Sequence, residues 1–314
     1  MSHFTVLVIG DDVEKQLQPY HEYECTGIED EYVIDVDTTD EVKEYLEREL
    51  FVGPRKDNGK IDDQYYEEQA NEYLTEWKKI TRLEYLQSKG LTPEEIEENI
   101  IDYHGFKKKE DGNWYRHTNP NSQWDWWVIG GRWSGFFKLK PGGAGRAGSS
   151  GFFGTPAEEG YVDVVKKKDI DFEGMLREAE DKAAKSYDVV WEVIKDTPVA
   201  ESWASVRERF DNRDEARKFY HAQERVIAAS EKLSPWFELD DYQVDRDVYI
   251  QREKNRTFST YAIVKDSKWY AKGKMGWWAI SSDEVDQNEW NQKVMELIES
   301  VDDETLFTLV DCHI

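Results

Sequence analysis

Residues 3–10 read HFTVLVIG, and residues 305–314, at the other end of the chain, read TLFTLVDCHI. Both stretches are short, β-branched and apolar, a pattern that predicts buried β-strands. We expect them to lie side by side in one central sheet, so that the chain ends meet. The sequence therefore predicts an α+β fold, with a central, mostly antiparallel sheet that joins the N- and C-terminal strands and carries helical insertions.

The predicted body comprises residues 1–59, 106–170 and 236–314, and two helical regions interrupt it. In the insertion 60–105, aromatic and apolar residues recur at three- and four-residue steps, which predicts a helix over 62–89. A second helix begins after Thr92, with Pro93 in its first turn and Glu95 at the capping-box position. The other insertion, 171–235, has a helical pattern interrupted at Pro198 and is predicted to be an antiparallel helical hairpin.

Shorter elements complete the predicted body. Strands are expected over 31–37, 161–170, 258–264 and 276–280, and a short acidic helix is expected over 40–50. Residues 281–301 predict a helix with Ser281 as its N-cap and Glu284 three residues further on.

The composition restricts the class of partner. The chain has 314 residues, of which 67 are acidic and 41 basic, so the formal net charge is −26. Charge of this sign opposes direct nucleic-acid binding and favours a basic protein as partner. No run of about 18 apolar residues predicts a membrane-spanning helix, and the N-terminus lacks the basic region of a signal peptide. Two cysteines do not make a disulfide framework, so a reducing cytoplasm is expected.

Residues 119–137, NPNSQWDWWVIGGRWSGFF, hold four tryptophans. On a strand, Trp124 and Trp126 would face one side and Trp127 the other, which predicts a strand covered on both faces. A second pair, Trp277 and Trp278, predicts cross-strand pairing that forms one aromatic core. A platform for stacking bases or sugars, and partial exposure at an interface, are the alternatives.

Residues 141–160 contain seven glycines and predict a flexible loop. The segment from Gly143 to Gly148 fits a GxGxxG pattern, but the residues after it cannot open a helix, which disfavours a nucleotide-phosphate site. A loop that orders on a partner is the favoured interpretation. Phe152 and Phe153 are its candidate partner-binding residues, and Arg132, beside the Gly130–Gly131 break that precedes the loop, is a third.

Cys25 and Cys312 form a candidate thiol pair if the terminal segments are neighbours. With His21 and His313 they would also make a Cys2His2 metal site, although the spacing matches no standard zinc pattern. Cys312 and His313 are adjacent on a strand and so point to opposite faces, which opposes a direct nucleophile–base pair. Two buried free thiols are the favoured interpretation, and no catalytic residue, metal or cofactor is predicted.

Two acidic runs lie far apart in the sequence. Residues 29–50 hold ten acids and residues 283–304 hold nine. If the chain ends are neighbours, we expect the two runs to share one surface that attracts a basic partner. A solvated face is the alternative and is the commoner explanation of any single acidic run. Asp283, Glu284 and Asp286 are the candidate partner-binding acids of the second run.

Four motifs carry a resemblance: MSHFTVLVIG at the start, WDWWVIGGRW, the segment GKMGWWAI with DEVDQNEW, and the ending TLVDCHI. Together, over nearly the whole chain, they resemble a family of tailed-bacteriophage proteins. The chain is also similar to the phage-encoded Gabija anti-defence proteins. This resemblance implies a non-enzymatic homo-oligomer that, in the host cytoplasm during infection, binds and encloses a host nuclease–helicase defence complex.

Two other functions stay open at the level of the sequence. One is a protein that sequesters an immune signalling nucleotide, for which Arg116, Arg132 and Trp133 are the candidate pocket residues. The other is an enzyme that uses Cys25 or Cys312 together with a histidine.

Overall fold

The computed structural model describes residues 2–152, 154–234, 237–276 and 281–314. The chain divides into two compact units. The first unit is Met1–Gln18 with Trp126–Ile314, and the second is Pro19–Asp125. The predicted insertion 60–105 lies inside the second unit, which begins well before it and ends after it.

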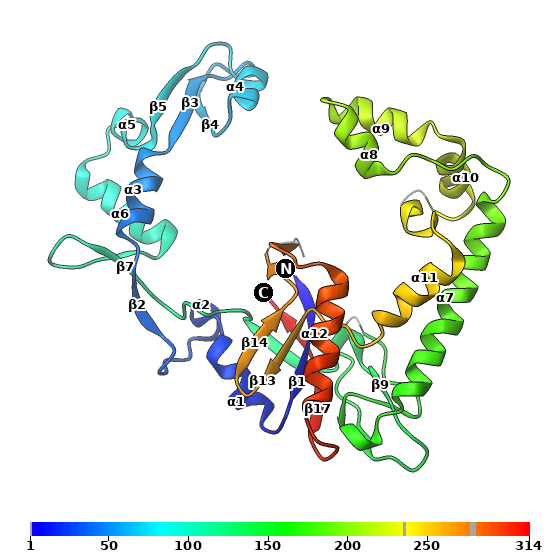
Figure 1. Cartoon of the computed structure of the whole chain (residues 1–314). Helices are drawn as coiled ribbons and strands as arrows, with labels where there is room; N and C mark the ends of the chain where they lie inside the picture. The colour runs from blue at the N-terminus through cyan, green and yellow to red at the C-terminus, as the bar shows by residue number, and fades with distance from the viewer. Residues whose placement is uncertain (1, 153, 235–236, 277–280) are drawn as a thin grey trace. The chain divides into compact units, whose positions relative to one another are not determined.

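The first unit contains the termini and most of the strands (Figure 1). Its strands are β1 (His3–Ile9), β8 (Trp126–Ile129), β9 (Phe137–Lys138), β10 (Gly145–Arg146), β11 (Tyr161–Val162), β12 (Val164–Lys166), β13 (Ala262–Lys265), β14 (Lys268–Ala271), β15 (Lys274–Met275), β16 (Ser281–Ser282) and β17 (Leu306–His313). Its helices are α1 (Val13–Leu17), α7 (Phe172–Ile194), α8 (Trp203–Arg209), α9 (Arg213–His221), α10 (Glu224–Lys232), α11 (Arg246–Asn255) and α12 (Gln287–Glu299), with 3-10 turns η2 (Gly131–Trp133), η3 (Lys167–Asp169) and η4 (Leu239–Tyr242).

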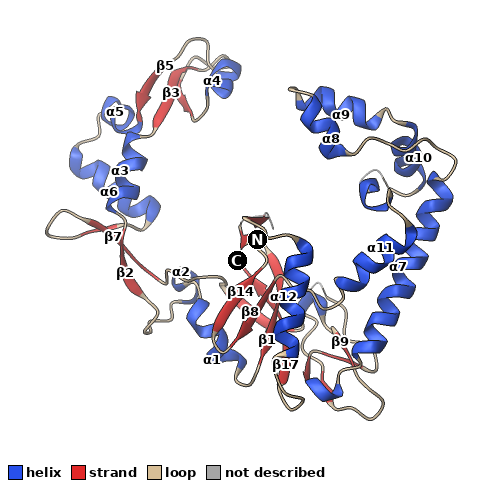
Figure 2. Ribbon diagram, in the orientation of Figure 1, coloured by secondary structure: helices blue, strands red, loops and turns tan. Residues whose placement is uncertain are grey.

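The central sheet joins the two ends of the chain. Its strand order is β10-β12-β17-β1-β13-β14, and β8 also pairs with β17. β1 and β17 are antiparallel, from His3 opposite His313 to Ile9 opposite Phe307. The pair β1–β13 is parallel, and the other ladders described in this sheet are antiparallel. The prediction of an α+β fold with a mostly antiparallel sheet joining the terminal strands is therefore confirmed (Figure 2).

Helix α12 covers one face of this sheet. Leu7, Phe307 and Leu309 of the sheet pack in one core with Val294 and Ile298 of the helix. The indole of Trp290, in the same core, donates to the carbonyl of Thr260 at 2.7 Å.

The start of α12 differs from the prediction. The N-cap is Asp286, whose carboxylate accepts from the backbone amides of Asn288 and Glu289. Ser281, the predicted cap, lies in β16, which pairs with β15. The predicted strand over 276–280, with its two tryptophans, falls mostly outside the described residues.

The helical region of the first unit is larger than the predicted hairpin of residues 171–235. It contains α7 to α11 and continues to Asn255. Tyr187 of α7 packs against Tyr249 of α11, and its hydroxyl donates to the carbonyl of Val244 at 2.7 Å. The segment after residue 235 therefore packs back against α7 through tyrosine contacts. The helical pattern of residues 171–235 alone does not predict this packing.

The second unit has two three-stranded sheets and short helices. Its strands are β2 (Ile34–Asp37), β3 (Glu49–Pro54), β4 (Ile61–Gln64), β5 (Lys78–Thr81), β6 (Lys107–Lys108) and β7 (Trp114–Thr118), in the orders β2-β7-β6 and β4-β3-β5. Its helices are α2 (Tyr23–Thr26), α3 (Thr39–Glu47), α4 (Glu67–Tyr73), α5 (Arg82–Ser88) and α6 (Pro93–His104), and the 3-10 turn η1 (Gln18–Tyr20) leads into it.

The predicted helix over 62–89 is wrong. The segment forms β4, α4, β5 and α5, because residues 61–64 and residues 78–81 both pair with β3. At Gly53 an added Cβ would lie 1.8 Å from the carbonyl oxygen of Glu76, so the backbones approach too closely for any side chain there. The predicted start of α6 is confirmed, since Thr92 and Glu95 form a complete capping box.

The length and apolar character of the helices bear on whether any of them could span a membrane. Among those in the described part of the chain, none combines the length and the apolar character needed to span a membrane.

Candidate protein-binding surface

A turn after β8 is the centre of the candidate site. β8 pairs with β17, with Ile129 opposite Val310, and the chain then passes through Gly130 and Gly131 at φ +83° and +58°. A Cβ on Gly131 would lie 2.2 Å from the Cβ of Asp311, so both the left-handed backbone and the space require glycine. The turn leaves Arg132 and Trp133 exposed immediately afterwards.

The buried carboxylate of Asp311 holds this turn against the ends of the central strands. Asp311 is 1% exposed. One of its oxygens accepts from the backbone amide of Arg132 at 2.9 Å, and the other lies 2.8 Å from Nδ1 of His3. The residue therefore connects β17, β1 and the turn, and its charge is satisfied by these contacts.

A second buried carboxylate, Asp163, organises the glycine-rich segment. It is fully buried between β11 and β12. It accepts from the hydroxyl of Ser134 at 2.9 Å and from the backbone amides of Gly135, Phe136 and Gly148 at 2.7, 3.3 and 2.7 Å. Charge-assisted hydrogen bonds of this kind are about twice as strong as neutral ones.

The predicted flexible loop is consequently wrong for the first half of residues 141–160. β10 pairs with β12, and Gly148 is bound to Asp163. The amide of Gly148, which a GxGxxG site would offer to a phosphate, faces a carboxylate instead. This arrangement agrees with the sequence argument against a nucleotide-phosphate site here.

Phe152 projects from the segment that follows. Gly131 donates to the carbonyl of Ser149 at 2.7 Å, and Ser149 donates to Ile129 at 2.9 Å. Phe152, three residues later, is 91% exposed. Phe153, the other predicted anchor, lies outside the described residues.

The tryptophans of residues 119–137 do not form one core. Trp124 is buried in the second unit, where it forms a β-bridge with His21. Trp126 and Trp133 are 44% and 37% exposed in the first unit. The ring of Trp126 stacks on His313, with centroids 5.5 Å apart, because β8 is an edge strand beside β17. We call the three aromatic residues Trp126, Trp133 and Phe152, together with the exposed Arg132, the exposed aromatic set.

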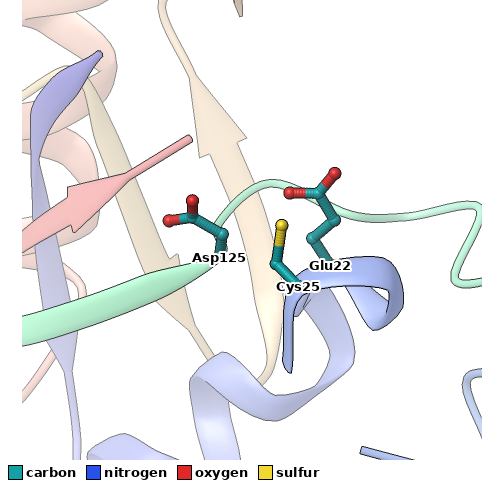
Figure 3. A group of neighbouring side chains, drawn as sticks. All are labelled: Glu22, Cys25 and Asp125. Atoms are coloured by element: carbon teal, nitrogen blue, oxygen red, sulfur yellow. The ribbon is translucent and has the colours of Figure 1, made fainter. Parts of the chain in front are cut away.

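The two cysteines lie in different surroundings. Cys25 is exposed on α2, and its thiol lies between the carboxylates of Glu22 and Asp125 (Figure 3). Desolvation, a hydrogen bond to Glu22 and the nearby negative charges raise the pKa of this thiol to about 11. The protonated thiol therefore predominates at neutral pH, which opposes nucleophilic attack. Glu22, Cys25 and Asp125 place one ligand atom each within 4.8 Å of the others.

Cys312 is fully buried in β17, opposite Trp127 of β8. His21 is buried in the second unit, where its Nδ1 lies 2.9 Å from the hydroxyl of Thr26, whereas His313 belongs to the first unit. The predicted thiol and metal candidates are thus divided between the two units. The thiol pair stays a prediction.

The predicted acidic anchors have partners within the chain. Asp283 pairs with Lys274 at 2.9 Å and Glu284 with Lys272 at 2.8 Å. Asp286 caps α12. A basic partner would have to compete with these contacts. The two acidic runs also belong to different units.

The residues that sequence reasoning missed are Asp163 and Asp311. Each interrupts an apolar strand, in the segments VDVV and LVDC. A charged residue at a position that strand periodicity assigns to the interior is the signal that could have found both.

Comparison with known proteins gave no match: no family model, no curated protein and no solved structure is significantly similar to the chain.

Proposed function

We propose that the protein acts by binding another protein through the exposed aromatic set. The observation that carries this proposal is Phe152, a large apolar ring that is 91% exposed on a segment bonded to the Gly130–Gly131 turn. Aromatic and arginine side chains dominate the binding energy of protein interfaces. A segment that is already ordered loses less entropy on binding than a flexible one.

The target proposed is a host antiviral nuclease complex of the Gabija type, which a homo-oligomer of this phage protein would enclose. The four sequence motifs that resemble tailed-phage proteins support a phage origin, and the length and acidity of the chain resemble those of the phage-encoded Gabija anti-defence proteins. The net charge of −26 also supports this target, because a complex that binds DNA carries a basic surface and opposite charge accelerates association. Inhibition would be steric and would not require chemistry by this chain.

The test is inhibition of a purified Gabija complex in a DNA-cleavage assay. Wild type is compared with a Trp133→Ala, Phe152→Ala double variant. The control is Trp191→Ala, which removes a tryptophan that is 42% exposed on α7 of the same unit. Losing an interface anchor costs about 2 kcal/mol or more, so the double variant should need at least roughly thirtyfold more protein for equal inhibition. Equal potency of the double variant and the control would refute the proposal that the exposed aromatic set is the binding surface.

The enzyme alternative predicts a different result. An enzyme that depends on Cys25 or Cys312 loses all activity on one Cys→Ser change, whereas a steric inhibitor retains its potency. We expect full inhibition from both single Cys→Ser variants in the same assay, because the thiol of Cys25 is held protonated and that of Cys312 is buried.

A further inference from the structure

A pocket in the second unit gathers arginines and tyrosines. Its volume is about 580 Å³, within the range of small-ligand sites. Its walls include two arginines and four tyrosines: Arg48, Arg82, Tyr45, Tyr65, Tyr66 and Tyr85. They come from α3, the residue that follows it, α5 and the segment between β4 and α4, so the folding of residues 60–90 assembles the pocket.

Both guanidinium groups lie over the same tyrosine ring. The Cζ atoms of Arg48 and Arg82 are 4.8 and 5.3 Å from the centroid of Tyr65. Arg82 also lies 4.4 Å from the ring of Tyr45 and donates to its hydroxyl at 3.1 Å. The backbone brings the pair together, since the amide of Arg82 donates to the carbonyl of Arg48 at 2.8 Å. Two like charges are thus held side by side.

Carboxylates do not neutralise this pair. Within the described part of the chain, neither Arg48 nor Arg82 forms an ion pair, whereas Arg55 of the same unit binds both Asp57 and Asp62. The carboxylate of Asp63 also lines the pocket, so the local charge is only partly offset.

Arg82 has an unused donor. Its Nε is buried and has no hydrogen-bond partner among the described residues. Leaving a buried charged donor unsatisfied is costly, and a guanidinium satisfies this need best with a bidentate phosphate or carboxylate. The Nε atoms of Arg116, Arg252 and Arg256 are in the same state, so the case for an anion rests on the juxtaposed guanidinium groups of Arg48 and Arg82 rather than on this one donor.

We propose that this pocket binds a mononucleotide, with its phosphate at Arg48 and Arg82. The ring of Tyr66 is 58% exposed and offers a face on which the base can stack, whereas the ring of Tyr65 already carries both guanidinium groups. A polynucleotide is disfavoured, because the second unit has 28 acidic and 13 basic residues, a net charge of −15. The phosphate of a mononucleotide is less affected than a polynucleotide by the acidic residues far from the pocket, because salt screens their charges beyond about 8–10 Å.

Isothermal titration of the full chain with AMP, adenosine and inorganic phosphate tests the site. AMP should bind with a Kd below about 1 mM. Adenosine and phosphate should each bind at least about tenfold more weakly, because each lacks one half of the recognition. Arg48→Gln should weaken AMP binding by at least about tenfold, and Arg48 is exposed, so the variant should fold. The matched control, Arg55→Gln, removes the same charge from the same unit and should bind AMP as wild type does.

Several results would overturn this assignment. Absence of AMP binding at about 1 mM would do so, as would adenosine or phosphate alone binding as tightly as AMP. Equal affinities of Arg48→Gln and wild type for AMP would remove the site from this pocket. Tighter binding of a short single-stranded oligonucleotide than of AMP would assign the arginines to nucleic acid instead. These outcomes are independent of the nuclease assay, because the pocket and the exposed aromatic set lie in different units.

Discussion

At the scale of single residues, two buried carboxylates account for the order of a segment that its composition marks as flexible. Burying a charge is expensive unless hydrogen bonds replace its water. Asp163 accepts four hydrogen bonds and Asp311 accepts from a backbone amide and faces an imidazole. Glycines suit this arrangement because backbone amides can reach a carboxylate only where no side chain intervenes.

Replacing Asp163 by asparagine tests the role of the charge. The amide keeps the shape, but its NH2 group would face the donors of Ser134 or Gly148 in place of an acceptor. We expect a loss of about 2–4 kcal/mol in the free energy of unfolding, measured by urea denaturation. Asp266→Asn, at an exposed carboxylate, should change stability by less than about 0.5 kcal/mol. Similar effects of the two substitutions would mean that Asp163 does not hold the segment.

His117 predicts a dependence of stability on pH. Hydrogen bonds to Asp35 and Glu29, at 2.8 and 3.1 Å, raise the pKa of this imidazole in the folded state. The contribution is fully present below the unfolded pKa of about 6.5 and is lost as pH rises through the higher folded value. Urea midpoints should therefore fall between about pH 6 and about pH 8. His117→Gln and Asp35→Asn should each reduce this fall, and a dependence unchanged by both would exclude His117 as its source.

At the scale of elements, local sequence patterns predicted the strands and helices correctly where the strand pairing of the folded chain agrees with them. The terminal strands were predictable because their residues are apolar on both faces, and α6 because Thr92, Pro93 and Glu95 form a start signal within four residues. Residues 62–89 were not predictable from spacing, since pairing with β3 overrides the helical periodicity.

The candidate site shows the same limit. Phe152 and Arg132 were found as exposed residues near the turn, but the exposure of Trp126 and Trp133 was not, because it depends on β8 being an edge strand beside β17. The arginine pocket was also missed, because α3 and α5 meet only through tertiary contacts: side chains of both helices share one hydrophobic cluster, and the amide of Arg82 donates to the carbonyl of Arg48.

Deleting residues 145–148 tests the glycine-rich segment as an element. The deletion removes β10 and the donor of Gly148, leaving Asp163 with fewer hydrogen bonds. We expect a loss of at least about 2 kcal/mol in urea denaturation, in contrast to a loop that tolerates shortening. Phe152→Ala, a few residues away, should leave stability within about 0.5 kcal/mol of wild type because its ring is exposed. If the deletion lowers the free energy of unfolding no more than Phe152→Ala does, the glycine-rich segment would again be interpreted as a flexible loop.

At the scale of the whole molecule, negative charge is distributed unevenly. The second unit carries −15 over 107 residues, so the remaining −11 of the total of −26 belongs to the larger first unit. Self-repulsion of this size destabilises a compact state. The ion pairs that oppose it in the second unit, such as Lys43–Asp40 and Lys79–Glu49, are largely exposed. Exposed pairs contribute about 0–1 kcal/mol each.

The balance between these terms predicts that salt stabilises the protein. Raising NaCl from about 20 mM to about 500 mM shortens the screening length from roughly 20 Å to about 4 Å. Long-range repulsion among the acids is then removed, whereas contacts near 3 Å lose less, so the urea midpoint should rise. Choline chloride should act alike if ionic strength is the cause. Glu44 and Glu47 are exposed on α3, and a Glu44→Gln, Glu47→Gln variant should begin at a higher midpoint and gain less from salt. A midpoint that falls with salt in both proteins would mean that the ion pairs outweigh the excess of negative charge.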